Sequence, residues 1–129
     1  MEKKVIAGEG IKVPDRKLNS VLQLDNVIIT SGVSPKDFVT NEWKTGMHDQ
    51  ALQCLKNIQI ILETAGATLE DLVVVECFIN DVRFYDEFNS VWNGFFKDVK
   101  CPPTRSTFQV GLLNPVMHVE MKAIAVKQK

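Results

Sequence analysis

The chain has 129 residues and a mass of 14.5 kDa, which suits one globular domain over residues 1–129. Hydrophobic residues make up 45% of the chain and charged residues 24%, so the composition argues against a disordered protein. The formal net charge of -1 argues against a polybasic nucleic-acid binder, which usually carries a clear excess of Lys and Arg.

Short strands and polar loops alternate in the first third of the sequence. The pattern predicts strands over residues 3–7, 20–24 and 27–31, with a loop over residues 8–19. Asp25 and Asn26 separate the second strand from the third, and both residue types tolerate the left-handed backbone of a tight hairpin. A second loop, which contains Pro35 and Gly46, is predicted over residues 33–46.

Two amphipathic helices are predicted in the rest of the chain. Apolar residues at helical spacing form one face from Ala51 to Ala65, and Gly66 marks the end of that helix. Thr68 and Asp71 have the spacing of a capping box. Asp81 is a candidate N-cap for the second helix. The apolar face of the second helix comprises Phe84, Phe88, Val91, Trp92, Phe95 and Phe96.

The remaining segments predict strands over residues 72–79, 106–110 and 116–126. The first and last strand pairs have the pattern of hairpins, so the order βββαβαββ predicts an α+β fold, with a single mixed sheet and two helices on one face. The strand over residues 27–31 carries apolar Val27 and Ile29 on one face and Ile28 on the other. Because two helices cover only one face, we expect another subunit to bury the second face.

The cysteines indicate reduced thiols and no metal site. Cys54, Cys77 and Cys101 are odd in number and far apart, without a CxxC pair, and only two histidines could join them. The start of the sequence lacks the apolar run of a signal peptide, and no apolar run is long enough to span a bilayer. We therefore expect a soluble cytoplasmic protein without a membrane span.

Two predicted strands carry polar residues that could belong to a site. Arg105 and Thr107 share one face of their strand, and Glu120 lies within the last strand. Such residues either face water or line a site, and the pattern leaves both explanations open. Ser31 and Gly32 end a strand, and Asn89 interrupts the apolar face of the second helix. A strand terminus and an exposed helix position also explain these residues.

Four segments taken together resemble the RidA/YjgF family. They are residues 27–32 (VIITSG), Asn80-Asp81 before the aromatic helix, residues 103–106 (PTRS) and residues 120–126 (EMKAIAV). Members of this family are reactive enamine and imine deaminases, which are also labelled endoribonuclease L-PSP-like. The resemblance covers nearly the whole chain. It implies a chorismate-mutase-like fold and a homotrimer whose sheets form a central barrel, with the sites in clefts between subunits.

The resemblance also implies roles for individual residues. Arg105 would hold the substrate carboxylate, and Glu120 would position or activate the attacking water; these two are the expected catalytic residues. Ser31 and Gly32 match the segment that lines the pocket, and Asn89 matches a polar helix residue near the cleft.

Two positions depart from the pattern of the family. Many members have a tyrosine in the first loop where this chain has Leu18, and a cysteine where it has Thr107. Leu18 and Thr107 are expected to line the substrate site, and the departures bear on substrate range and rate.

The activity that the resemblance implies is hydrolysis of 2-imino acids, or their enamine tautomers, to 2-keto acids and ammonia, in the manner of a 2-iminobutanoate/2-iminopropanoate deaminase. This reaction is expected to need no metal or organic cofactor. Three alternatives stay open. The first is a non-catalytic trimer that senses 2-keto acids, the second is a ribonuclease, and the third is a deaminase of a different enamine. The net charge and the lack of a basic aromatic stripe argue against the ribonuclease.

Overall fold

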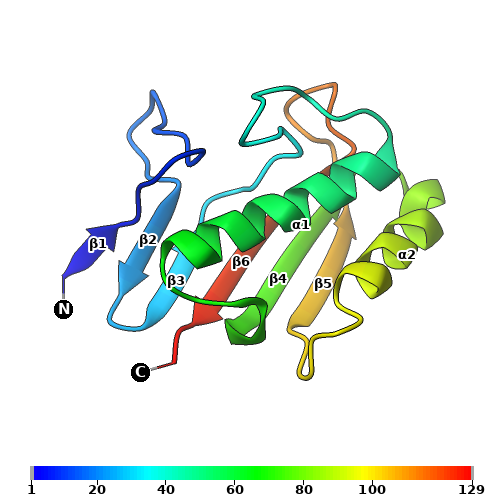
Figure 1. Ribbon diagram of the computed structural model, residues 1–129. Helices are drawn as coiled ribbons and strands as arrows, with labels where there is room; N and C mark the ends of the chain where they lie inside the picture. The colour runs from blue at the N-terminus through cyan, green and yellow to red at the C-terminus, as the bar shows by residue number, and fades with distance from the viewer. Residues whose placement is uncertain (1, 129) are drawn as a thin grey trace.

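One mixed sheet of six strands runs through the protein, with its strands in the order β1-β2-β3-β6-β4-β5 (Figure 1). The structure is a computed structural model, and it describes residues 2–128. The strands are β1 (Lys3–Val5), β2 (Val21–Leu24), β3 (Val27–Thr30), β4 (Leu72–Ile79), β5 (Thr104–Gln109) and β6 (Val119–Val126). The helices are α1 (Met47–Thr64) and α2 (Tyr85–Phe95), with short 3₁₀ turns η1 (Leu69–Asp71) and η2 (Val82–Phe84).

The predicted hairpin at Asp25 and Asn26 is confirmed. β2 and β3 pair antiparallel, with Leu24 opposite Val27, and Asp25 has a φ of 51°. This left-handed conformation is the one that Asp and Asn tolerate better than most residues. β1 pairs with the outer edge of β2 and is shorter than predicted, because it ends at Val5.

Glycines flank the long helix α1. Gly46 (φ 80°) precedes its first turn, and Gly66 (φ 78°) follows its last, so the predicted stop is confirmed. The capped turn after it also forms, since the Thr68 backbone N–H donates to Asp71 Oδ2 at 2.8 Å. Leu55, Ile58 and other members of the predicted apolar stripe are buried between α1 and the sheet.

The prediction of a closing hairpin is wrong. β5 pairs parallel with β4, and α2 makes the crossover between them. β6 instead runs antiparallel between β3 and β4. Residues 116–118 were predicted as strand, but Asn114 holds a turn there. Its backbone carbonyl accepts from Met117 N–H at 3.0 Å, and its side chain accepts from Val116 N–H at 3.1 Å.

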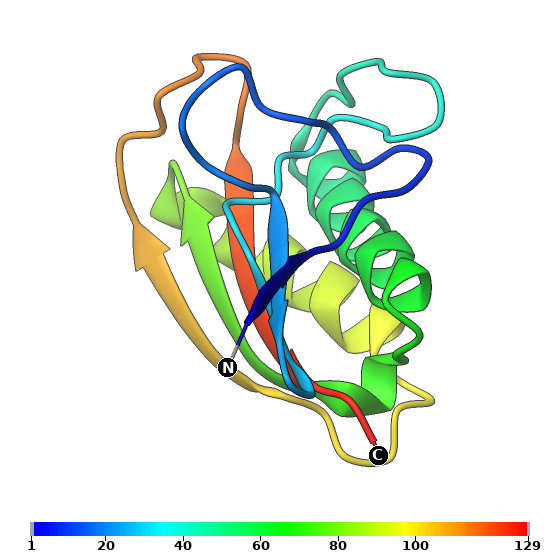
Figure 2. The same cartoon turned by 90° about the vertical axis from the view of Figure 1, so that its left-hand side faces the viewer.

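Both helices lie on the same face of the sheet, as predicted (Figure 2). Side chains on that face, such as Ile28, Val75 and Met121, are fully buried. On the opposite face Ile29 and Ile124 are only half-buried, and Phe108 is 50% exposed with its ring stacked on Phe78 at 6.1 Å. In one chain this sheet is open, and the trimeric barrel stays a prediction.

Neither helix of residues 2–128 is both long enough and apolar enough to cross a membrane.

Candidate functional site

Arg105 lies on the helix-covered face of the edge strand β5. Its register partner Val75 is fully buried beneath the helices, and its own side chain is half-buried against α2. The guanidinium carbon lies 5.0 Å from the ring centroid of Trp92, 5.2 Å from that of Phe88 and 5.9 Å from that of Tyr85. These distances are within the range of cation–π attraction, so three aromatic rings hold the charged head in place.

Two neutral oxygens accept hydrogen bonds from the same nitrogen of Arg105. Nη2 donates to Asn89 Oδ1 at 2.8 Å and to Tyr85 Oη at 3.1 Å. Within residues 2–128 no carboxylate forms an ion pair with this guanidinium. A half-buried cation without an anionic partner is a ready binding site for a small carboxylate.

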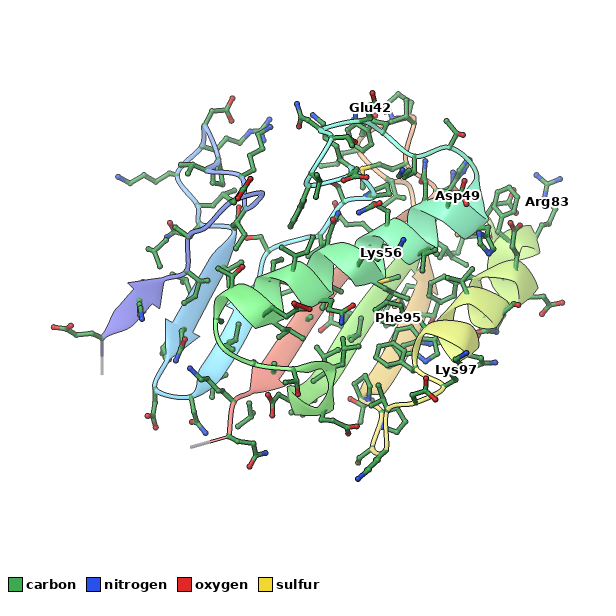
Figure 3. All side chains as sticks on the ribbon, in the orientation of Figure 1. Glu42, Asp49, Lys56, Arg83, Phe95 and Lys97 are labelled. Carbon is green, nitrogen blue, oxygen red and sulfur yellow. The ribbon has the colours of Figure 1, made fainter. Side chains whose placement is uncertain are left out.

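The helix α2 supplies the aromatic wall because of its spacing. Tyr85, Phe88 and Trp92 are three and four residues apart, and therefore lie on one face together with Asn89. Figure 3 labels Arg83 in η2, just before this helix, and Phe95, the last residue of the helix. Asn89 was expected near the site. Tyr85 was missed, although its position one helical turn before Asn89 was a signal for it.

Thr107 is the next residue on the same face of β5. Its Oγ1 is buried and has no hydrogen-bond partner among the described residues. Leaving such an atom unpaired costs about 1–3 kcal/mol, which calls for an explanation such as a ligand. Its register partner is Cys77, and burial raises the pKa of that thiol to about 12, against a smaller opposing effect of the Arg105 charge. Cys77 is therefore a protonated thiol and no nucleophile.

Glu120 lies on β6 and points to the open face of the sheet, since its neighbours Val119 and Met121 are fully buried on the helix face. Its side chain is half-buried, and burial raises the pKa of its carboxyl. The carboxyl packs directly on Gly32. That residue is held beside β6 because Val33 and Met121 exchange two backbone hydrogen bonds, at 2.6 and 3.1 Å.

Ser31 directly precedes Gly32, and Leu18 lies in the first loop, which Ser31 contacts. The Ser31 hydroxyl donates to the Asn19 carbonyl at 2.6 Å, so it fastens the first loop to the end of β3. Leu18 is 48% exposed in that loop and makes no contact with Arg105 that the structure records. A cleft of about 500 Å³ opens between the loops over residues 8–20 and 33–41. Gly32 borders this cleft, but Arg105 and Glu120 do not line it.

The expected site residues therefore form two separate groups within one chain. Arg105, Asn89 and Thr107 are together on the helix face, whereas Glu120 and Gly32 are together on the open face. Arg105 is level with Val75 of β4, and Glu120 is level with Phe78. Two strand spacings and three residues along the strand separate their Cα atoms by about 14 Å. One chain alone does not bring the two groups to one substrate.

Within residues 2–128, no three His, Cys, Asp or Glu side chains come together in a way that could hold a metal ion. The arrangement offers a half-buried guanidinium without an ion pair among the described residues and a carboxyl of raised pKa.

Comparison with known proteins gives a consistent result. The family model described as "Endoribonuclease L-PSP" matches residues 12–127. A 2-iminobutanoate/2-iminopropanoate deaminase of Escherichia coli K12 is 33% identical over 108 residues, which cover 83% of this chain and 84% of that protein. A RutC family protein of Pyrococcus abyssi is 33% identical over 129 residues, which cover 99% of this chain and 100% of that protein.

Solved structures agree with the fold. The YjgF gene product of E. coli superposes with a TM-score of 0.89 at 32% identity, covering 97% of this chain and 99% of its own. E. coli TdcF, solved with bound serine, superposes with a TM-score of 0.88 at 29% identity and the same coverage.

Proposed function

This chain belongs to the RidA/YjgF family, the family of the endoribonuclease L-PSP model, and from that membership we propose that it is a cofactor-free deaminase of 2-imino acids. Water and a 2-imino acid, or its enamine tautomer, would give a 2-keto acid and ammonia. The observation that carries the proposal is the Arg105 guanidinium, which rests among three aromatic rings without an anionic partner in residues 2–128.

Arg105 would bind the substrate carboxylate. A planar guanidinium donates two parallel hydrogen bonds to a carboxylate, which fixes both the position and the orientation of the adjacent imine carbon. The aromatic rings restrict the motion of the guanidinium before the substrate arrives. Fixing the reacting carbon in this way supplies a large part of the acceleration that an enzyme without a cofactor can achieve.

Glu120 would orient and activate the attacking water. Burial raises the pKa of its carboxyl, and a raised pKa makes its carboxylate a stronger base than an exposed glutamate. The carboxylate would accept a proton as the water oxygen bonds to the imine carbon. That proton would then pass to the nitrogen and give a carbinolamine. The hydroxyl proton of the carbinolamine would follow to the nitrogen, the C–N bond would break, and ammonia would leave as the keto group forms. No electrons are exchanged, so the reaction needs no oxidant or reductant.

The active assembly would be a homotrimer, with each site shared between two copies. The separation of Arg105 from Glu120 on opposite faces of one sheet supports this arrangement, because a substrate cannot reach through the sheet. The half-buried apolar side chains Ile29 and Ile124 on the open face, with the exposed Phe108, favour burial against further copies.

A coupled assay tests the activity. A serine or threonine dehydratase would generate the imine, and the protein should accelerate its conversion to the keto acid. The Arg105→Lys variant is the matched control, because it keeps the positive charge but cannot donate two parallel hydrogen bonds to a carboxylate. Equal imine decay with wild type, with the variant and without protein would contradict the proposal.

A second candidate is a non-catalytic sensor of 2-keto acids. It is favoured because Arg105, Asn89 and Thr107 come together within one chain, whereas Glu120 lies on the opposite face of the sheet. Saturable binding of 2-ketobutyrate without any turnover of freshly generated 2-aminoacrylate would identify the sensor.

A further inference from the structure

The hydrogen bonds of Arg105 leave a specific problem for a carboxylate ligand. A guanidinium grips a carboxylate with two nitrogens in one of two ways: end-on through Nη1 and Nη2, or side-on through Nε and Nη2. Both ways use Nη2. Here Nη2, which carries two hydrogens, already donates to both Asn89 Oδ1 and Tyr85 Oη. A carboxylate that binds through two guanidinium nitrogens must therefore take over one of these two hydrogen bonds.

Of the two acceptors, Tyr85 is the one that a carboxylate can displace. Its contact with Nη2 is the longer of the two, at 3.1 Å against 2.8 Å for Asn89, and its side chain is 38% exposed. A tyrosine hydroxyl can also change role, because it both accepts and donates a hydrogen bond. The side-chain oxygen of Asn89 only accepts, so it would repel a carboxylate oxygen placed against it.

From this geometry we infer that Tyr85 positions the substrate in the Arg105 site. Its hydroxyl accepts from Arg105 Nη2 in the free protein. When a 2-imino or 2-keto acid binds, the hydroxyl turns and donates to the carboxylate oxygen that has replaced it on Nη2. The bound carboxylate then receives hydrogen bonds from both Arg105 and Tyr85, while Asn89 still holds the other hydrogen of Nη2.

The position of Tyr85 is well determined by the fold. It is the first residue of α2, and the preceding turn is held by Asp81, which accepts from the Arg83 backbone N–H at 2.9 Å. The ring also lies within cation–π distance of the guanidinium, so two kinds of contact keep it beside Arg105. Leu18 offers no hydroxyl from the first loop. The chain has one tyrosine, and it lies on α2.

The inference rests on the proposed carboxylate site, and a binding experiment separates it from catalysis. Calorimetry with 2-ketobutyrate compares wild type with Tyr85→Phe, which keeps the ring and removes the hydroxyl. We expect binding to weaken by about two- to tenfold, the loss of one hydrogen bond. Methyl 2-oxobutyrate lacks the carboxylate charge, and its binding should be the same in both proteins. Equal affinity of the two proteins for 2-ketobutyrate would overturn the inference.

A spectroscopic measurement supplies a second test. Because Tyr85 is the sole tyrosine, protein grown with ring-¹³C tyrosine shows one set of ring signals. Saturating 2-ketobutyrate should shift these signals in wild type and leave them unchanged in Arg105→Lys. Signals that do not move at saturation, or a wild-type protein that binds no 2-ketobutyrate, would overturn the role of Tyr85. If binding depends on Tyr85 but no imine is turned over, the inference stands and the deaminase proposal fails.

Discussion

Gly32 and the carboxyl group of Glu120 are packed so closely that no side chain fits between them. A Cβ atom built on Gly32 would lie 2.8 Å from both Cδ and Oε1 of Glu120, and 3.1 Å from Oε2. Non-bonded carbon and oxygen atoms do not approach so closely, so the absence of a side chain at residue 32 is what allows Glu120 its present position. The φ angle of Gly32 is not positive, so the reason is contact and not backbone conformation.

We therefore predict that Gly32→Ala displaces the Glu120 carboxyl. Because misplacing a catalytic group by about 1 Å can cost on the order of 100-fold in rate, turnover of the imine should fall about 10- to 100-fold. Binding of 2-ketobutyrate through Arg105 should persist. The coupled dehydratase assay and calorimetry measure the two quantities separately.

The control for this variant is Gly111→Ala, where an added Cβ meets nothing within 4 Å. It should retain wild-type turnover. Adding Glu120→Asp to Gly32→Ala shortens the carboxyl side chain and relieves the contact, so this double variant should lose less rate than the two single losses combined. Full activity of Gly32→Ala would show that the position of the carboxyl does not matter for turnover.

Glu120→Gln should abolish most turnover and leave the affinity for 2-ketobutyrate unchanged, because the amide keeps the shape but not the basicity of the carboxylate. In wild type the rate should fall as the pH drops through the raised pKa of Glu120, since protonation removes the base. That acidic limb should lie above the ordinary range of a glutamate, about 4.3. Wild-type turnover by the variant would make Glu120 structural only.

The raised pKa of Glu120 also gives a prediction about stability. Stability should fall as the pH rises, whereas the rate should fall as the pH drops. A raised carboxyl pKa means that the folded state binds the proton more tightly than the unfolded state does. The free energy of unfolding should therefore decrease as the pH rises from the unfolded pKa through the folded one. Denaturant titrations over this window should show the decrease in wild type and a smaller one in Glu120→Gln. Identical slopes would contradict the raised pKa.

The shared site can be tested by mixing two inactive variants. Arg105→Lys and Glu120→Gln, unfolded together and refolded, should regain activity that neither shows alone. Random assembly would give about a quarter of the sites both native residues, one from each copy. Refolding each variant separately is the control. Light scattering should give a mass well above the 14.5 kDa of one chain. A monomeric mass, or no recovery after mixing, would contradict the shared site.

Leu18 gives a prediction about substrate preference. At a site lined by Leu18, leucine would form an apolar wall where a tyrosine would add a hydroxyl, so the alanine-derived imine should react more slowly than the longer leucine- and methionine-derived imines. Leu18→Tyr should narrow this gap. An amino-acid oxidase generates the three imines in place for comparison. A preference for the alanine-derived imine that Leu18→Tyr leaves unchanged would show that Leu18 does not line the site.

The local pattern of the sequence was sufficient to predict several helices, strands and turns. The helix after Gly46, its stop at Gly66, the hairpin at Asp25 and the strand over residues 72–79 all formed where predicted. These features depend on neighbouring residues: helical spacing, left-handed turn conformations and apolar runs act over a few positions. The period of two also showed correctly that Arg105 and Thr107 share a face.

The tertiary structure decided which strands are neighbours and which face the helices cover. The sequence by itself determined an α+β chain with two helices and named Arg105, Asn89 and Glu120, but the last two strands were paired wrongly. Only the insertion of β6 between β3 and β4 places Glu120 against Gly32, and only the parallel β4–β5 crossover brings Arg105 under α2 beside Tyr85. The physical reason is that alternation fixes relative faces within one strand, whereas strand order depends on contacts between residues far apart in the chain.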